Sequence, residues 1–329
     1  MVDLTIGIPT FNREDRLIDL INFLLDEINK HDINNIEIIV SDNDPHNYKN
    51  KENLKDSINK GKGFISYYQN NQNIGAVKNV ISIFEKAKGR YLWIIGDDDM
   101  PSRLLLQNIM HLVTSVKPSI IYIPSTWSSA GKDRLNIIPT FRNSFKKINS
   151  LSLIKEAHIY VTFLSSWIVD TDQLRKDKDF NHLKYCETNF PHLAWIGSLI
   201  KQNKEIFIGK GIGIHAIGGN SGGYDVIKSF SKELPAILND SFGEHAAETR
   251  FLNKSIFGFY LPAIIGNIRK GNLGDFELNH NELAYYKGSL LTRLYFNFII
   301  KRLIVCGKLE LILLTFMYRS FKYIYLRVL

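Results

Sequence analysis

The chain has 329 residues, of which 45% are hydrophobic and 22% are charged, and its formal net charge is +8. This apolar content suits one large or two small globular domains and excludes a disordered chain, while only 22 Gly and 9 Pro exclude a collagen-like or low-complexity one. The two cysteines, Cys186 and Cys306, lie far apart, which argues against a disulfide framework or a cysteine-based zinc site.

The positive charge is concentrated in the tail, residues 284–329. Eight Lys and Arg side chains stand there against one acid, Glu310, so the tail carries +7 and the preceding residues carry +1. Bulky aliphatic and aromatic residues alternate with these basic ones. This pattern favours helices that lie on an anionic membrane surface, with ordinary helices packed against the protein as the alternative, and it argues against a nucleic-acid partner.

Neither a transmembrane segment nor a secretory signal is expected. No run of about 18 apolar residues lacks a charge, and the first residues lack a basic region followed by an apolar one. Together with the basic tail, this predicts a cytoplasmic protein that is peripheral on the inner face of the cell membrane.

The first 125 residues alternate between short apolar runs and helical patterns. Residues 4–9 predict a buried strand, and Asn12 is placed to cap the helix that follows it. Further strands are expected at 36–40, 64–68, 91–95 and 120–123, and further helices at 76–88 and 102–116. The alternation predicts an α/β fold with a mostly parallel sheet flanked by helices, which binds ligands beyond the carboxyl ends of its strands.

The pattern is looser after residue 125. We expect a strand at 161–169, a helix at 190–202, and a strand at 206–215 that runs into the glycine-rich loop 218–223. Several helical segments follow from 225 to 281, with breaks near Ser231, Ser241 and Gly271. No internal repeat is apparent.

Three consecutive carboxylates, Asp97, Asp98 and Asp99, come directly after Gly96 and the strand YLWII. Such carboxylates repel one another unless a cation lies among them, and Mg²⁺ or Mn²⁺ prefers oxygen ligands and can bridge to a diphosphate. A solvated acidic turn is the alternative. The position after a buried strand favours a metal site.

Polar clusters also follow the other strands. Each alone would be an ordinary turn or helix cap, but all of them converge on one edge of the predicted sheet, which favours a binding site there. The residues concerned are Pro9, Thr10 and Arg13 after the first strand, Asp42 after the second, and Asn73, Gly75, Lys78 and Asn79 after the third.

In this order and spacing, the segments TIGIPTFNRED, IIVSDND, NQNIGAVKN and YLWIIGDDD resemble the family-two glycosyltransferases with the GT-A fold. The resemblance covers residues 2–125 well and later residues loosely. It implies a nucleotide-diphosphate sugar as donor, a divalent metal as cofactor and inversion at the anomeric carbon. It also implies the GT-A form of the α/β fold, a Rossmann-like sheet, here with a C-terminal helical extension.

The resemblance also implies roles for particular residues. Pro9, Thr10 and Arg13 would line the nucleotide pocket, and Asp42 would read the base. Asn73, Gly75, Lys78 and Asn79 would lie near base and ribose, Asp97 would bind the donor, and Asp98 and Asp99 would hold the metal. One position departs from the family, because its common pattern is Asp-x-Asp-Asp and Gly96 stands first here.

Inverting transfer needs a carboxylate or histidine that deprotonates the acceptor hydroxyl. Relatives carry a Glu-Asp pair for this, and the only such pair here, Glu14-Asp15, lies on the wrong helix. Glu187 is at the expected distance from the Asp-rich turn and is the first candidate, with His192 as the second. Purely structural roles for both residues are the alternative. His215, before the glycine-rich loop, resembles the late histidine of GT-A enzymes that lies near metal or diphosphate. A surface histidine beside a flexible connector is the alternative.

These observations predict a GT-A domain at residues 1–225, with the nucleotide-sugar part at 1–125 and the acceptor side at 126–225, and a helical extension at 226–329. The expected function is metal-dependent transfer of a sugar from a nucleotide-diphosphate sugar to a glycan acceptor. The basic tail favours a lipid-linked acceptor, and similarity to O-antigen and polysaccharide enzymes favours surface polysaccharide synthesis. A nucleotidyltransferase and a non-catalytic binder of nucleotide sugar or glycan remain alternatives.

Overall fold

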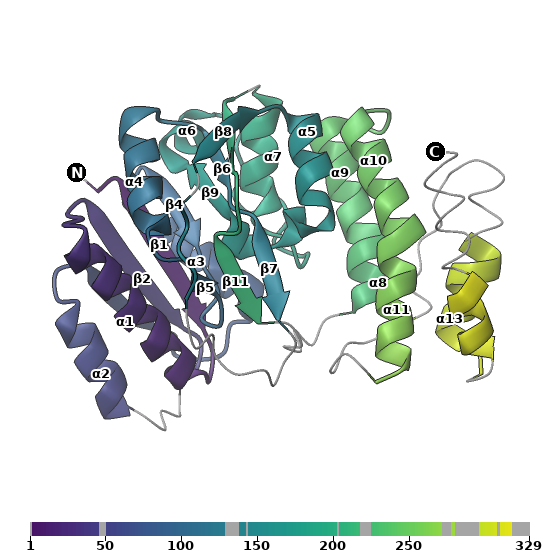
Figure 1. Cartoon of the computed structure of the whole chain (residues 1–329), viewed down its shortest axis with the longest axis horizontal. Coiled ribbons are helices and arrows are strands. Elements are labelled where there is room, and N and C mark those ends of the chain that lie inside the picture. The colour runs from purple at the N-terminus through teal and green to yellow at the C-terminus, as the bar shows by residue number, and fades with distance from the viewer. Residues whose placement is uncertain are drawn as a thin grey trace. The chain divides into compact units, whose positions relative to one another are not determined.

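The computed structural model describes residues 2–45, 51–128, 138–142, 144–202, 204–217, 225–271, 278–279, 296–307 and 310–317 (Figure 1). The chain divides into two compact units. The first consists of Met1–Leu153 and Tyr160–Gly218, and the second of Ile154–Ile159 and Gly219–Leu329. The domain boundaries expected at 125/126 and 225/226 remain predictions.

The first unit is built around a large sheet in the strand order β3-β2-β1-β4-β9-β6-β10-β8. Strands β1 to β4 run parallel to one another, as do β6 and β10, whereas β9 and β8 are antiparallel to their neighbours. The expected mostly parallel sheet is confirmed. Its strands are β1 (Leu4–Thr10), β2 (Ile36–Asp42), β3 (Ile65–Gln69), β4 (Tyr91–Ile94), β6 (Ile120–Tyr122), β8 (Phe145–Ile148), β9 (Trp167–Asp170) and β10 (Ile206–Gly209).

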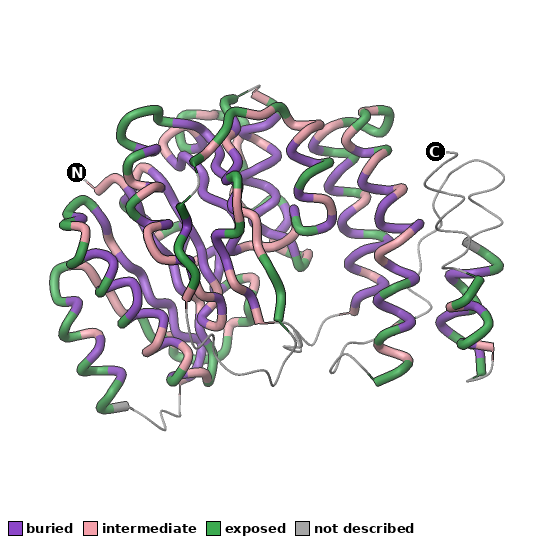
Figure 2. The backbone as a smooth tube through the Cα atoms, viewed as in Figure 1, coloured by how far each residue is buried: buried purple, intermediate pink, exposed green. Residues whose placement is uncertain are grey.

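Helices cover both faces of this sheet. On one face, α1 (Glu14–Lys30) and α4 (Leu105–Ser115) bury their apolar sides against alternate residues of the strands, and α2 (Lys51–Lys60) packs against α1. On the other face lie α3 (Ala76–Lys86) and α7 (Leu193–Lys201). Figure 2 shows the continuous burial of the central strands. Both faces of the strands are therefore apolar, as the near-continuous hydrophobic runs in the sequence predict.

Gly7 in β1 allows α3 to approach the sheet closely. A Cβ atom at this position would lie 2.3 Å from Cγ2 of Ile83. Any larger residue would push α3 away from β1, and α3 begins beside the carboxyl ends of the strands. The glycine therefore helps to set the position of one wall of the candidate site.

A small second sheet joins three distant segments in the order β5 (Met100–Pro101), β11 (Ile214–Ile217) and β7 (Ser125–Ser128). The single strand expected at 206–215 is therefore wrong, since β10 and β11 belong to different sheets. Between them the backbone changes partners: Lys210 N–H donates to Ser144 O, and Gly213 N–H donates to Pro124 O.

Two other local expectations are also wrong. Asn12 does not cap α1: it has a φ of 53°, and Arg13 is the N-cap residue, without a side-chain cap. Asparagine tolerates this left-handed conformation, which turns the chain sharply after β1. The strand expected at 161–169 forms only from Trp167, because local hydrogen bonds such as that from Ser166 N–H to Phe163 O create short 3₁₀ turns before it.

The remaining helices of the first part of the chain are short. Helix α6 (Thr171–Lys176) was not predicted from the sequence. Its N-cap residue is Asp170, whose side chain accepts a hydrogen bond from Gln173 N–H. Helix α5 (Ser150–Ala157) and the 3₁₀ turn η1 (His158–Thr162) contain the points where the chain passes between the two units. The second 3₁₀ turn, η2 (Leu164–Ser166), leads into β9.

The described residues of the second unit are largely helical, as expected. Its helices include α8 (Val226–Lys228), α9 (Leu234–Phe242), α10 (Ala247–Ser255), α11 (Leu261–Arg269) and α13 (Lys301–Val305), with π-helical turns η3 (Ser229–Glu233), η4 (Ile256–Tyr260) and η6 (Phe296–Ile300). In the part of the chain that the structure describes, no helix is long and apolar enough to cross a membrane.

The π-turns η3 and η4 reveal a short repeat that the sequence analysis missed. Each is followed at once by Leu-Pro-Ala-Ile, at 234–237 and again at 261–264. Proline lacks the N–H for the helical hydrogen bond and its ring crowds the preceding turn, which accounts for a widened turn at both places. The expected break at Ser231 is thus a π-turn within a continuous helical segment.

Candidate active site

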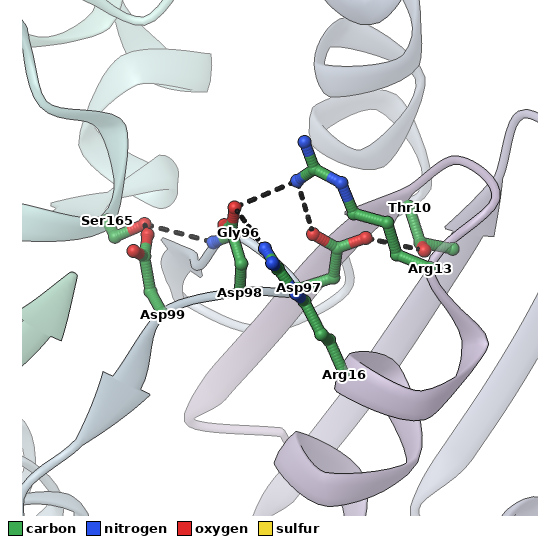
Figure 3. A network of polar contacts seen from close by, with 8 residues as sticks. All are labelled: Thr10, Arg13, Arg16, Gly96, Asp97, Asp98, Asp99 and Ser165. Carbon is green, nitrogen blue, oxygen red and sulfur yellow. Dashed lines mark hydrogen bonds and ion pairs between the residues drawn. The ribbon is translucent and has the colours of Figure 1, made fainter. Parts of the chain in front are cut away.

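The Asp-rich turn lies at the carboxyl end of β4, beside β1. Because these strands are parallel neighbours, the residues that follow each of them meet at the same edge of the sheet. Figure 3 shows the three carboxylates, two arginines of the β1–α1 region, and the hydroxyl groups of Thr10 and Ser165. The structure thus brings the polar residues that follow the first strand together with the Asp-rich turn.

Asp97 faces the β1 side of the site and is 4% exposed. Thr10 Oγ1 donates a 2.7 Å hydrogen bond to its Oδ2, and Arg13 donates to its Oδ1 at 3.1 Å. Burial raises the pKa of Asp97 to about 6, with a further contribution from the charge of Asp98, while Arg13 and Thr10 act in the opposite direction. Asp97 therefore links the Asp-rich turn to the end of β1 and the beginning of α1.

Asp98 is held by two arginines. Arg13 donates to its Oδ2 at 2.8 Å, and Arg16 approaches the same oxygen at 3.4 Å. Arg16 was not singled out in the sequence, although its place one helical turn after Arg13 puts both on one side of α1. The two guanidinium groups also offer hydrogen-bond donors that fit phosphate oxygens.

Asp99 is held from the opposite side by a residue far along the chain. Ser165 Oγ donates to Asp99 Oδ2 at 2.5 Å and accepts a 2.9 Å hydrogen bond from Gly96 N–H. Burial raises the pKa of Asp99 well above its usual range, and the charge of Asp98 adds to the rise. No local pattern distinguishes Ser165 in the sequence, because its partners come from a separate strand.

Gly96 provides the space in which two of these carboxylates converge. A Cβ atom at Gly96 would lie 2.9 Å from Asp99 Oδ2 and 3.0 Å from Asp98 Oδ1. The departure from the family's pattern thus has a local steric basis: the oxygens of Asp98 and Asp99 occupy the volume where a side chain would begin.

The donor set of Asp98 and Asp99 fits a hard divalent cation. Among the residues that the structure describes, no group of three or more His, Cys, Asp or Glu side chains is arranged to hold a metal ion. Mg²⁺, however, is commonly bound through one or two carboxylates together with substrate phosphates. Burial and the neighbouring charge of Asp98 both disfavour the ionised form of Asp99, and a bound cation would favour it.

Asp42, the last residue of β2, is buried, and two hydrogen bonds hold its carboxylate. Tyr67 donates its hydroxyl to Asp42 Oδ2 at 2.6 Å, and Asp44 N–H donates to Oδ1 at 2.8 Å. Tyr67, which the sequence analysis did not single out, lies directly across from Val40 in the β2–β3 pair. The carboxylate is thus fixed at the carboxyl end of its strand, near the other polar clusters of this edge.

An amide network connects β2 with the start of α3. Asn43 donates to Asn73 Oδ1 at 2.6 Å and accepts from Ile74 N–H at 2.9 Å. Asn79 is buried and exchanges hydrogen bonds with Ser41, whose hydroxyl donates to it at 2.7 Å. Asn73 and Asn79 therefore brace the loop between β3 and α3.

The other predicted donor residues lie at the same edge. Gly75 has a φ of 84° at the start of α3, a conformation that favours glycine, and its N–H donates to Asn73 Oδ1. Lys78 is exposed on the first turn of α3. Pro9 is half-buried in β1, paired with Ser41 of β2.

His215 lies beside the Asp-rich turn. In the small sheet it pairs with Met100, the residue that follows Asp99, and its Nε2 is 2.8 Å from Ser102 Oγ. Burial lowers the pKa of His215, so the ring is neutral near pH 7. The glycine-rich loop expected to move beside it, residues 218–223, lies outside the described residues.

The two candidate bases have different environments. Glu187 is exposed, in a series of turns that precedes α7. His192 is 3% exposed among apolar side chains that include Ile94, Trp167 and Trp195, around a cavity of about 10 Å³. Burial lowers the pKa of His192 to about 3, although hydrogen bonds to the backbone at Thr162 and Val161 oppose the shift. A neutral core histidine fits these surroundings better than a base that meets substrate.

Comparisons with known proteins agree with this architecture. The model of the family described as glycosyl transferase family 2 matches residues 5–166. No curated protein sequence matches the chain. A crystal structure of S. aureus TarS superposes with a TM-score of 0.52 and 14% identity, over 81% of this chain and 44% of TarS.

Two structures of TarS residues 1–349 extend the comparison. The complex with UDP gives a TM-score of 0.52 at 15% identity, over 82% of this chain and 72% of the other. The complex with UDP-GlcNAc gives 0.57 at 16%, over 78% and 73%. Of the TarS structure in the first comparison, which is longer, this chain spans less than half. The likeness confirms the GT-A fold that the sequence motifs imply.

Proposed function

We propose that this chain, whose residues 5–166 belong to glycosyl transferase family 2, transfers a sugar from a nucleoside-diphosphate sugar to a hydroxyl of a glycan acceptor. The observation that carries the proposal is the convergence of Asp98 and Asp99 oxygens over Gly96, beside the guanidinium groups of Arg13 and Arg16. This arrangement combines a place for a divalent cation with donors for a diphosphate.

The nucleoside would bind along the carboxyl ends of β1, β2 and β3. Asp42, fixed by Tyr67, presents a carboxylate that can accept a hydrogen bond from a base N–H, and uracil offers such a group. UDP and UDP-GlcNAc occur in the solved TarS complexes, which supports a uridine nucleotide as the first donor to test. Lys78 and the braced loop around Asn73 would contact the ribose side.

The diphosphate would lie over the Asp-rich turn. Asp98 and Asp99 would hold Mn²⁺ or Mg²⁺, which when bound offsets charge on the leaving diphosphate. Arg13 would contact phosphate oxygens and would exchange part of its contact with Asp98 for them. His215, neutral and close to the turn, would donate a hydrogen bond on the same side.

The transfer itself would be a single displacement. An acceptor oxygen forms a bond to the anomeric carbon from the face opposite the diphosphate, and the bond from that carbon to the diphosphate oxygen breaks. The configuration at this carbon is therefore inverted. Glu187 would take the proton of the acceptor hydroxyl, a role that its exposed carboxylate permits.

A membrane-bound, lipid-linked acceptor remains part of the proposal. In the described residues of the second unit, the segment 296–317 exposes several bulky apolar side chains next to the exposed Lys301 and Arg302. These apolar side chains are Phe298, Val305, Ile312, Leu313 and Phe316. Apolar and basic groups together suit the interface of an anionic membrane. The protein would then lie at the inner face of the cell membrane, and its product would be surface polysaccharide.

The test is a screen of nucleotide sugars with Mn²⁺, starting with UDP-GlcNAc, that measures release of nucleoside diphosphate by the wild type and by Asp98→Asn. The proposal expects metal-dependent release from one donor and at least a roughly 100-fold loss in Asp98→Asn. Asp56→Asn, an exposed carboxylate on α2, is the matched control and should retain full release.

The outcomes separate the alternatives. Release of pyrophosphate from a nucleoside triphosphate would identify a nucleotidyltransferase instead. Metal-dependent donor binding without release or transfer, even with acceptor glycans present, would identify a binding protein. Undiminished release in Asp98→Asn would reject the proposed metal site.

A further inference from the structure

Three aromatic side chains cluster at the edge of the small sheet. The Trp127 ring, on β7, lies 4.6 Å from the Phe163 ring and 6.0 Å from the Tyr160 ring, between ring centroids. The Trp127 and Tyr160 planes differ by only 25°, so the two rings are stacked. Phe163 supports Trp127 from the side at an angle of 55°.

This cluster is open to solvent, unlike the other tryptophans of the unit. Trp127 is 44% exposed and Tyr160 is 46% exposed, while Trp93, Trp167 and Trp195 are buried. Two flat rings with nearly parallel planes are therefore exposed together, which suits a flat, ring-shaped ligand better than a flexible lipid chain.

Two connections place the cluster close to the Asp-rich turn. Phe163 is two residues from Ser165, whose hydroxyl binds Asp99, and Trp127 pairs with Ala216 on β11, the strand that joins β7 to β5. Two residues of chain span at most about 7 Å, and two strand spacings about 10 Å. The rings thus lie on the order of 10 Å from the carboxylates, on the side away from the nucleotide residues of β2 and β3.

We propose that Trp127 and Tyr160 form a binding platform for a sugar ring of the acceptor glycan. The proposal rests on the proposed glycosyl transfer and names the acceptor subsite of that reaction. A pyranose ring presents C–H groups on its faces and hydroxyl groups on its rim. The C–H groups carry partial positive charge and are attracted to the electron-rich faces of indole and phenol rings.

Tryptophan fluorescence gives a direct test. All four tryptophans of the chain lie in the described part, and of these Trp127 alone is exposed, so it accounts for most emission that acrylamide quenches. Trp127→Phe checks this assignment by removing the quenchable fraction. Quenching is then measured with maltohexaose, cellohexaose and chitohexaose as probes, and separately with phosphatidylglycerol vesicles.

The platform predicts that at least one oligosaccharide protects Trp127 from acrylamide, and that Tyr160→Ala weakens its binding about 10-fold. Val116→Ala, which alters a 44% exposed apolar residue at the end of α4, should leave the affinity unchanged. Protection by vesicles and by no oligosaccharide would show a lipid-binding surface and overturn the proposal. Absence of protection by every probe, or equal affinity in Tyr160→Ala, would overturn it as well.

Donor chemistry is measured independently on the wild-type protein. Release of nucleoside diphosphate without glycan protection would reject the platform and leave the proposed function intact. Glycan protection in a protein that releases nothing from any nucleotide sugar would reject the transfer reaction and would show a glycan-binding surface at Trp127.

Discussion

Ser165 Oγ lies 2.5 Å from Asp99 Oδ2 and at the same time accepts the N–H of Gly96, which begins the turn that Asp99 ends. One hydroxyl group thus binds both ends of the Asp-rich turn, from a segment that precedes β9. We infer that Ser165 positions the Asp99 carboxylate for metal binding without touching the substrate itself.

Ser165→Ala should weaken the apparent affinity for Mn²⁺ in donor release by about 10-fold to 100-fold, the usual effect of losing a residue that orients a metal ligand. The change leaves Asp99 without its donor and Gly96 N–H without its acceptor. Mn²⁺ titrations of activity provide the measurement. Ser119→Ala is the matched control, because its buried hydroxyl donates to Gln173 at the opposite edge of the sheet. An equal effect in both variants would indicate a loss of packing rather than of positioning.

Gly96→Ala should lower both metal-dependent release and stability. The added Cβ would lie within 3.0 Å of oxygens from Asp98 and Asp99, so at least one carboxylate must move. Such overpacking costs about 1 to 3 kcal/mol. Urea unfolding and Mn²⁺-dependent turnover give the two readouts. Gly96→Asp, which restores the pattern common in the family, should fare no better. Full activity in Gly96→Asp would show that the turn adapts and that the steric argument is wrong.

Glu187→Gln should abolish most transfer while donor affinity stays within about twofold, because a general base contributes about 10² to 10⁴ to the rate. Binding is measured by titration with a nucleotide sugar and transfer with an acceptor glycan. The control is Asp179→Asn, another exposed acid of the same series of turns. Wild-type turnover in Glu187→Gln would remove this residue from the mechanism.

His192 should make stability depend on pH. Its pKa falls from 6.5 to about 3 on folding, so between these values the unfolded chain binds a proton that the folded chain does not. Stability is therefore complete above about pH 6.5 and decreases as the pH falls. At pH 5 the loss from this group is about 2 kcal/mol.

Urea unfolding of wild type and His192→Gln at pH 5 and pH 7.5 measures this contribution. The variant should be less sensitive to acid, and it should retain catalysis if the ring is only a core group. The same pH sensitivity in both proteins would contradict the neutral buried histidine, and loss of turnover without loss of stability would restore His192 as a candidate base.

The sequence predicts most of the donor half because its signals are local. A buried strand such as residues 4–10 shows as an apolar run, and the polar residues that follow it must lie at the carboxyl edge of a parallel sheet. Asp42 and Asp97 could therefore be placed without coordinates. The family's motifs add roles to these positions, and the mostly parallel sheet is confirmed.

Other features depend on contacts between distant segments. Ser165 is an ordinary serine until the fold places it against Asp99, and Tyr67 gains its partner Asp42 only through the pairing of β2 with β3. The largely apolar pattern at 206–215 hides the change of sheet, since β10 and β11 are both largely buried. His192 is an opposite case. The sequence suggests a catalytic role for this polar residue, whereas the fold buries it in the core.

The position of strand β9 in the sheet has a consequence for folding during synthesis of the chain. It lies between β4 and β6 in the sheet, yet both of those strands precede it in the chain. On the ribosome, one edge of β4, with Leu92 and Trp93, has no partner until residue 170 has emerged. Exposed apolar strand edges attract other chains. We therefore expect the growing polypeptide to need chaperone protection during this interval, and a fragment that stops at residue 125 should aggregate rather than fold.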